Sequence, residues 1–114
     1  MMQTVVETRH YMARAEKILS DAERHEFINV IASQPLSGVL LVGTGGIRKM
    51  RFARGARGKS AGVRVIYFVH DLEHPIFLLE IFAKNEKANL SSAERNALAD
   101  FVQQIKEEFR RGEQ

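Results

Sequence analysis

The sequence predicts an α+β fold, in which an antiparallel β-sheet carries two N-terminal helices and one C-terminal helix packed on it. Two capping boxes of the form S-x-x-E, at Ser20 and Ser91, each mark the start of a helix. Between these boxes lie three β-type segments with short connections, at 47–53, 63–70 and 76–84. Short connections favour antiparallel neighbours, so we expect the three segments to form a meander.

Length and composition indicate one globular domain, which we expect to span 1–114. The 114 residues are 45% apolar and 27% charged, as is ordinary for such a domain. The chain has no cysteine, which excludes disulfides and thiolate metal sites. No apolar run approaches the ~20 residues of a membrane span. The N-terminus lacks the apolar core of a signal peptide, so we expect a cytoplasmic protein without membrane contact.

The N-terminal third is expected to form a short strand and two helices. Residues 3–7 (QTVVE) are β-branched, and apolar residues recur at helical spacing over 11–19. Ser20 then restarts the chain as a second helix, which ends before Pro35. We expect the two helices to form an αα-hairpin on the sheet. The apolar stripe of the second helix is predicted to be Phe27, Val30 and Ile31.

The rest of the chain is expected to form the meander and a long helix. A short apolar run at 39–42 and a glycine-rich turn precede the first strand. The second strand (VRVIYFVH) is rich in β-branched and aromatic residues, and the third (IFLLEIFAK) is almost wholly apolar. From Ser92 onward, an amphipathic helix is predicted to pack its apolar stripe on the body or to extend it to a partner. That stripe comprises Leu98, Phe101, Val102, Ile105 and Phe109.

The segment 43–64 concentrates the positive charge of the chain. It contains seven basic residues and no acidic one, whereas the remaining 10 basic residues face 14 acidic residues. Such a concentrated positive field favours a polyanion, and a phosphate backbone is the usual one. The alternative interpretation is that this segment is a basic loop exposed to solvent, without a bound polyanion. The seven basic residues are Arg48, Lys49, Arg51, Arg54, Arg57, Lys59 and Arg64.

Strand alternation predicts that several basic side chains converge on one face of the sheet. Lys49 and Arg51 share one face of the first strand of the meander, whereas Arg48 lies on the other face. Arg64 and Lys84 lie at the ends of the next two strands. A solvated sheet face usually mixes charges of both signs. A cluster of one sign has an electrostatic cost, so we expect an anion to bind there.

Two other patterns in the sequence are not interpreted as functional sites. Residues 53–60 (ARGARGKS) match a relaxed phosphate-binding loop, but that loop needs a helix directly after it, and a strand is predicted instead. His70 and His74 straddle a predicted turn and are taken as ordinary surface histidines. We therefore expect no metal site and no cofactor. Glu80 is expected to face Lys49 or Arg51 across the sheet as an ion pair.

Three linked motifs resemble the RelE/ParE superfamily of bacterial toxins, and the HigB-type branch most closely. They are GGIRKMR at 45–51, GVRVIY at 62–67 and FAKNEK at 82–87. The resemblance covers nearly the whole chain and implies a RelE-like fold. It implies the toxin of a type II toxin–antitoxin system, a ribosome-dependent endoribonuclease that cleaves translated mRNA. The implied reaction is attack of a ribose 2′-OH on the adjacent phosphate, without a metal.

The resemblance also implies roles for individual residues. The expected catalytic set is Lys49, Arg51, Arg64 and Lys84. We assign transition-state stabilisation to Arg51 and Arg64, because a guanidinium binds phosphoryl oxygens bidentately. The acid–base residue stays open between Lys49 and Lys84, and a tyrosine that RelE carries beyond this segment is replaced by the run Ala-Asn-Leu at 88–90. Residues expected to hold RNA more generally are Arg48, Arg54, Arg57, Lys59 and Lys87.

The implied partners are mRNA, the ribosome and a cognate antitoxin, expected to be a HigA-like helix-turn-helix protein. Two alternatives remain open at this stage. One is a ParE-like toxin of the same fold, which inhibits gyrase and is not a nuclease. The other is a non-catalytic RNA-binding module, in which aromatic residues would typically alternate with the basic residues on the sheet. The sequence does not give the oligomeric state.

Overall fold

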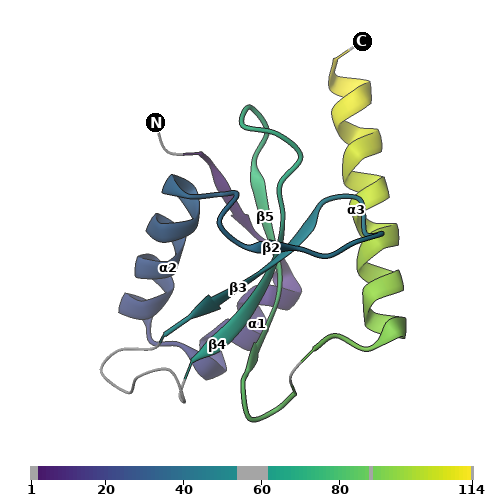
Figure 1. Ribbon diagram of the computed structural model, residues 1–114. Coiled ribbons are helices and arrows are strands. Elements are labelled where there is room, and N and C mark those ends of the chain that lie inside the picture. Colours follow the sequence, from purple (N-terminus) through teal and green to yellow (C-terminus); the bar gives the residue numbers. More distant parts are fainter. Residues whose placement is uncertain (1–2, 54–61, 88, 114) are drawn as a thin grey trace.

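Helices cover both faces of a five-stranded sheet in this protein (Figure 1). The structure is a computed structural model and describes residues 3–53, 62–87 and 89–113. The strand order across the sheet is β1-β5-β4-β3-β2. The elements in chain order are β1 (Val5–Glu7), α1 (Arg9–Ile18), α2 (Asp21–Ser33), β2 (Val39–Leu40), β3 (Ile47–Phe52), β4 (Val63–Phe68), β5 (Ile76–Ala83) and α3 (Ser92–Gly112).

The predicted antiparallel meander of β3, β4 and β5 is confirmed. The sheet as a whole is mixed, because β1 pairs in parallel with the first half of β5. The short strand β2 pairs antiparallel with only two residues of β3, Arg48 and Lys49. Beyond Lys49, the edge of β3 is therefore left without a neighbouring strand among the described residues. The sequence indicates β2 only as part of a short apolar run.

The two N-terminal helices begin at capped positions. The hydroxyl of Thr8 accepts a hydrogen bond from the backbone N–H of Tyr11 at 3.3 Å and donates to the carbonyl of Leu78 at 2.8 Å. This cap starts α1 two residues before the predicted position and fastens it to β5. The predicted capping box of Ser20 and Glu23 is present at the start of α2. Both helices contribute to the same core on one face of the sheet, as the predicted arrangement requires.

Two cores hold the sheet in place. On one face, α1 and α2 bury Tyr11 and Phe27 against β4 and β5. On the other face, α3 buries Val102 and Ile105 against the same strands. β4 contributes to both cores, since its side chains alternate between Val63, Val65 and Tyr67 on the first face and Ile66 and Phe68 on the second.

The predicted stripe of α3 packs on the body except at Phe101, a residue that is 41% exposed. The sheet meets α3 along a narrow line through Val102 and Ile105, and Phe101 lies beside that line. There it lines an open apolar hollow of about 330 Å³ between α3, β5 and the start of α1.

Among the residues that the structure describes, no helix combines the length and apolarity that crossing a bilayer requires.

A buried tyrosine positions the loop that leads into β2. The Tyr67 hydroxyl accepts a hydrogen bond from the backbone N–H of Gly38 at 2.8 Å. A Cβ atom at position 38 would lie only 2.5 Å from this hydroxyl, so the close approach requires glycine. Arg48 holds the same loop, because its guanidinium donates to the carbonyls of Leu36 and Gly38 at 3.2 and 2.8 Å. The loop is thereby fixed beside β3.

Replacing Tyr67 with phenylalanine should lower the free energy of unfolding by about 1–3 kcal/mol, because the buried N–H of Gly38 loses its acceptor. Tyr11→Phe is the matched control. Tyr11 is equally buried, but its hydroxyl has no hydrogen-bond partner in the described chain, so its removal should be neutral or stabilising. Urea unfolding of both variants measures the difference. Equal destabilisation of the two would contradict a structural role for the Tyr67–Gly38 bond.

Candidate functional site

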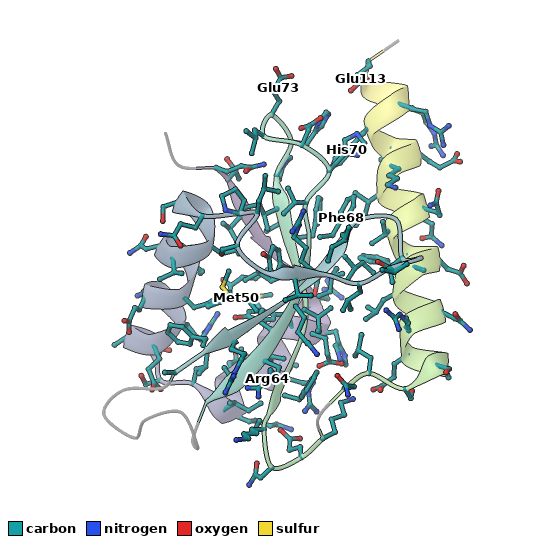
Figure 2. All side chains as sticks on the ribbon, in the orientation of Figure 1. Met50, Arg64, Phe68, His70, Glu73 and Glu113 are labelled. Carbon is teal, nitrogen blue, oxygen red and sulfur yellow. The ribbon has the colours of Figure 1, made fainter. Side chains whose placement is uncertain are left out.

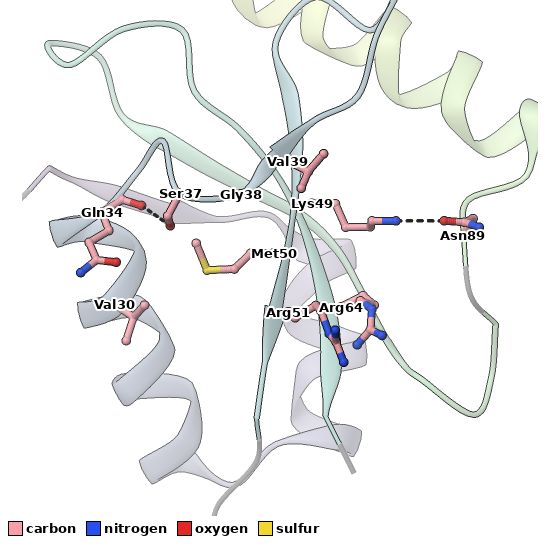
Figure 3. Close-up of a pocket in the computed structure, with 10 residues that line it drawn as sticks. All are labelled: Val30, Gln34, Ser37, Gly38, Val39, Lys49, Met50, Arg51, Arg64 and Asn89. Carbon is pink, nitrogen blue, oxygen red and sulfur yellow. Dashed lines mark hydrogen bonds between the residues drawn. The ribbon is translucent and has the colours of Figure 1, made fainter. Parts of the chain in front are cut away.

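Two arginines face one another on adjacent strands at the centre of the site. Arg51 on β3 lies directly opposite Arg64 on β4, and Phe82 on β5 lies opposite Arg64 on the other side. Figure 3 shows the Arg51 and Arg64 side chains next to each other. Directly opposed like charges in an antiparallel pair are destabilising. Within the described ranges, neither arginine has an acidic partner, so their charges are uncompensated.

Lys49 adds a third cation on the same face of β3, two residues from Arg51. Its ammonium donates a hydrogen bond to the Asn89 side-chain oxygen at 2.9 Å (Figure 3). Asn89 lies in the segment between β5 and α3, so this bond ties that segment to β3. Within the described residues, Lys49 forms no ion pair. Of the four residues predicted to converge, Lys49, Arg51 and Arg64 line one groove, whereas Lys84 is not among the residues that line it.

An open groove of about 660 Å³ runs beside these cations and along the free edge of β3. The groove exists because β2 ends its pairing at Lys49, leaving the backbone of Met50 and Arg51 without a neighbouring strand among the described residues. One wall comes from α2 and the loop after it, and the other comes from β3, β4 and Asn89. The lining residues are Val30, Gln34, Ser37, Gly38, Val39, Lys49, Met50, Arg51, Arg64 and Asn89.

The two lysines beyond β5 differ in their surroundings. Lys84 is exposed, and its backbone N–H donates to the carbonyl of Gly62 at 3.3 Å, beside the start of β4. Its side chain has no polar partner among the described residues. Lys87 lies 2.5 Å from the Glu94 carboxylate and 5.1 Å from the centre of the Phe82 ring. The hydrogen bond from Lys87 is the main reason that the pKa of Glu94 falls to about 2. Lys87 is thus engaged with α3, and an RNA phosphate would have to compete with Glu94.

Of the remaining predicted RNA contacts, the structure places only Arg48, and Arg48 does not join the cluster. Arg48 points to the opposite face of β3, as alternation predicts, and its guanidinium holds the loop at Leu36 and Gly38. Arg48 therefore has a structural role. Arg54, Arg57 and Lys59 lie outside the described residues. Their expected contacts with RNA stay predictions.

The predicted pairing of Glu80 with Lys49 or Arg51 is wrong. Glu80 instead binds two residues of α1, Arg14 at 2.9 Å and His10 at 2.6 Å. The pairing of β4 with β5 shifts register between Ile66 and Tyr67, and such a bulge re-aims the side chains beyond it. Arg14 also binds Glu86 at 2.9 Å. The pKa of Glu86 is lowered mainly by a hydrogen bond from the backbone N–H of Ala83, and to a smaller extent by the hydrogen bond from Arg14.

The positive charge of the site is uncompensated because the nearby carboxylates are paired with other basic residues. Glu80 and Glu86 are held by Arg14, and Glu94 is held by Lys87. None of these three acids contacts Arg51 or Arg64. A dianionic or monoanionic oxygen-rich ligand, such as a phosphodiester, is the natural complement of such a cation cluster.

Sequence reasoning missed two polar residues at this site, Asn89 and Arg95. Together with Lys49, they line a second hollow of about 80 Å³ next to the groove. Arg95 also donates to the carbonyl of Val42 at 3.4 Å. A signal for Arg95 was available, because a basic residue in the first turn of a helix opposes the helix dipole. Asn89 carries no comparable signal, since its role depends on the fold of the segment before α3.

Comparison with known proteins identifies the family. The family model described as the RelE toxin of the RelE/RelB toxin–antitoxin system matches residues 4–110. The fold also matches the E. coli toxin RelE, solved in the free state as a variant in which two arginines are replaced by alanine. That match has a TM-score of 0.58 and 17% identity, and it covers 92% of this chain and 99% of the other. Because the family match spans nearly all of its length, the chain belongs to the RelE toxin family of toxin–antitoxin systems.

Proposed function

We propose that this toxin is a ribosome-dependent endoribonuclease, which cleaves translated mRNA without a metal and thereby inhibits translation and growth. Membership of the family implies an antitoxin partner. The observation that carries the proposal is the opposed pair Arg51 and Arg64, which lacks an acidic partner in the described chain and borders an open groove. A phosphodiester placed there would relieve the repulsion between the two guanidiniums.

The proposed reaction uses the RNA's own nucleophile. The ribose 2′-OH loses its proton and attacks the adjacent phosphorus, forming a new P–O bond. The bond to the 5′-oxygen of the next nucleotide breaks, and that oxygen takes up a proton. The products are a 2′,3′-cyclic phosphate and a 5′-hydroxyl. Negative charge gathers on the non-bridging oxygens in the transition state, where Arg51 and Arg64 would bind it.

Lys49 and Lys84 are the candidates for proton transfer. A proton-transfer group must lie within hydrogen-bond reach of the proton that it moves. Lys49 is the stronger candidate, because Asn89 holds its nitrogen at 2.9 Å on the face that carries Arg51. Lys84 is exposed beside the start of β4, from where it would protonate the leaving oxygen.

The surrounding basic residues would bind the RNA phosphates electrostatically. We assign this role to Arg54, Arg57, Lys59 and Lys87. The logarithm of the binding constant for RNA should fall linearly with the logarithm of the salt concentration, with a slope of about −0.7 for each phosphate neutralised. The RNA-binding alternative fits less well, since Phe52 and Phe82 are 8% and 0% exposed and offer no surface for base stacking. The three motifs at 45–51, 62–67 and 82–87 favour the HigB-type branch, and we propose a HigA-like antitoxin on that basis.

Arg64→Lys should damage cleavage although it keeps the charge, because an ammonium cannot contact two phosphoryl oxygens as a guanidinium does. Binding to ribosomes should change little. Arg110→Lys, an exposed position near the end of α3 that pairs with Glu107, is the matched control and should cleave normally. Single-turnover cleavage on programmed ribosomes measures the effect. Full activity of Arg64→Lys would argue against a bidentate contact, and full activity of Arg64→Ala would remove Arg64 from the site altogether.

Lys49→Ala and Lys84→Ala should slow cleavage unequally, since loss of a proton-transfer group typically costs ~10²–10⁴-fold in rate. We expect the larger loss at Lys49, and an intermediate loss in Asn89→Ala, which frees the Lys49 ammonium. The same assay should give 2′,3′-cyclic ends in the presence of EDTA at a level that leaves ribosomes intact. Equal wild-type rates in both lysine variants would exclude them as proton-transfer groups. Complete inhibition by EDTA under these conditions would exclude the metal-free route.

A further inference from the structure

A second cluster of functional side chains lies at the turn between β4 and β5. From the sequence, His70 and His74 are expected to be ordinary surface histidines, because metal sites need converging ligands. The structure brings both together with Asp71, and one donor atom from each lies within 4.8 Å of the others. Figure 2 shows His70 and Arg64 toward opposite ends of the molecule. Six residues of strand separate these two by roughly 20 Å.

Two of the three distances between the donor atoms are near the spacing that a metal requires, and the third, between the two histidine nitrogens, is at most 4.8 Å. The second carboxylate oxygen of Asp71, Oδ2, lies 2.9 Å from His74 Nδ1 and 3.9 Å from His70 Nε2. Ligands of a tetrahedral ion with bonds of about 2.0–2.1 Å are roughly 3.3 Å apart. The two observed distances fall on either side of this value. A small rotation of the partly exposed His70 ring would equalise them.

Hydrogen bonds fix the Asp71 ligand in advance. Asp71 Oδ1 accepts from the backbone N–H groups of Glu73 and His74 at 2.9 and 2.8 Å and also lies 2.8 Å from His74 Nδ1. A metal bound to Oδ2 and Nδ1 would replace the hydrogen bond that joins these two atoms. The Gln3 amide donates to the carbonyls of both Asp71 and His74, across the turn. The turn is therefore held from two sides, and its carboxylate has one defined direction.

The far side of the His74 ring has the partner that metal-bound histidines normally have. His74 Nε2 lies 3.2 Å from the Glu113 carboxylate, at the end of α3. A histidine that binds a metal through one nitrogen almost always donates its other N–H to a carboxylate, carbonyl or water. Phe109 stacks on the same ring with a centroid distance of 4.2 Å, which fixes its plane. This arrangement orients Nδ1 toward His70 and Asp71.

We propose that His70 Nε2, Asp71 Oδ2 and His74 Nδ1 bind one divalent transition-metal ion of the zinc class, with water completing the coordination. Two imidazoles and one carboxylate suit Zn²⁺ better than Mg²⁺ or Ca²⁺, which prefer oxygen ligands. Through Glu113, the ion fastens the β4–β5 turn to the C-terminal end of α3. This site is independent of the proposed nuclease reaction, and cleavage should not require it.

The test titrates the untagged full chain, first freed of metal, with Zn²⁺ in competition with a chromogenic chelator. We expect one equivalent to bind, with no displacement by excess Mg²⁺. His70→Ala and His74→Ala should each abolish this binding, and Glu113→Gln should weaken it by about 10–100-fold. His25→Ala, an exposed histidine on α2, is the matched control and should bind as the wild type does.

Circular dichroism in the absence of metal establishes that each variant is folded before titration. Wild-type Zn²⁺ affinity in folded His70→Ala or His74→Ala would overturn the proposal, as would failure of the wild-type chain to bind Zn²⁺ at all. Unchanged affinity in Glu113→Gln would overturn the link to α3. A Co²⁺ complex with visible absorption bands typical of tetrahedral nitrogen and oxygen ligation would support the assigned donors.

Discussion

The repulsion between Arg51 and Arg64 is the constraint on which the rest of the site depends. Two guanidiniums directly opposite one another on paired strands oppose that pairing, and the strands are held together by other forces. β4 supplies them, because it is buried on both faces, by α1 and α2 on one side and by α3 on the other. The two hydrophobic cores thus stabilise a charge arrangement that a bound anion would relieve.

The fold keeps this charge available in two ways. First, the acids nearest to the site are bound elsewhere: Arg14 holds Glu80 and Glu86, and Lys87 holds Glu94. Second, β2 is only two residues long, so the edge of β3 beside Arg51 borders an open groove. The Tyr67–Gly38 hydrogen bond sets where β2 begins, which links a buried contact in the core to access at the surface.

Local patterns in the sequence were enough to predict the meander, both capping boxes and the shared face of Lys49 and Arg51, because alternation and capping depend on neighbouring residues. Contacts between distant segments were not predictable in this way. The parallel pairing of β1, the partners of Glu80 beyond a register shift, the exposure of Phe101 and the approach of His70 to His74 all depend on tertiary packing. Asn89 belongs to the same class, since only the folded segment before α3 brings it to Lys49.

A double-mutant cycle on Arg51 and Arg64 tests the central claim most directly. Single-turnover mRNA cleavage on ribosomes would be measured for the wild type, Arg51→Ala, Arg64→Ala and the double variant. If both guanidiniums bind the same phosphoryl group, each single variant should lose on the order of 10²-fold or more in rate. The double variant should then lose much less than the product of the two losses. Fully multiplicative losses, or a wild-type rate in either single variant, would contradict a shared phosphate site.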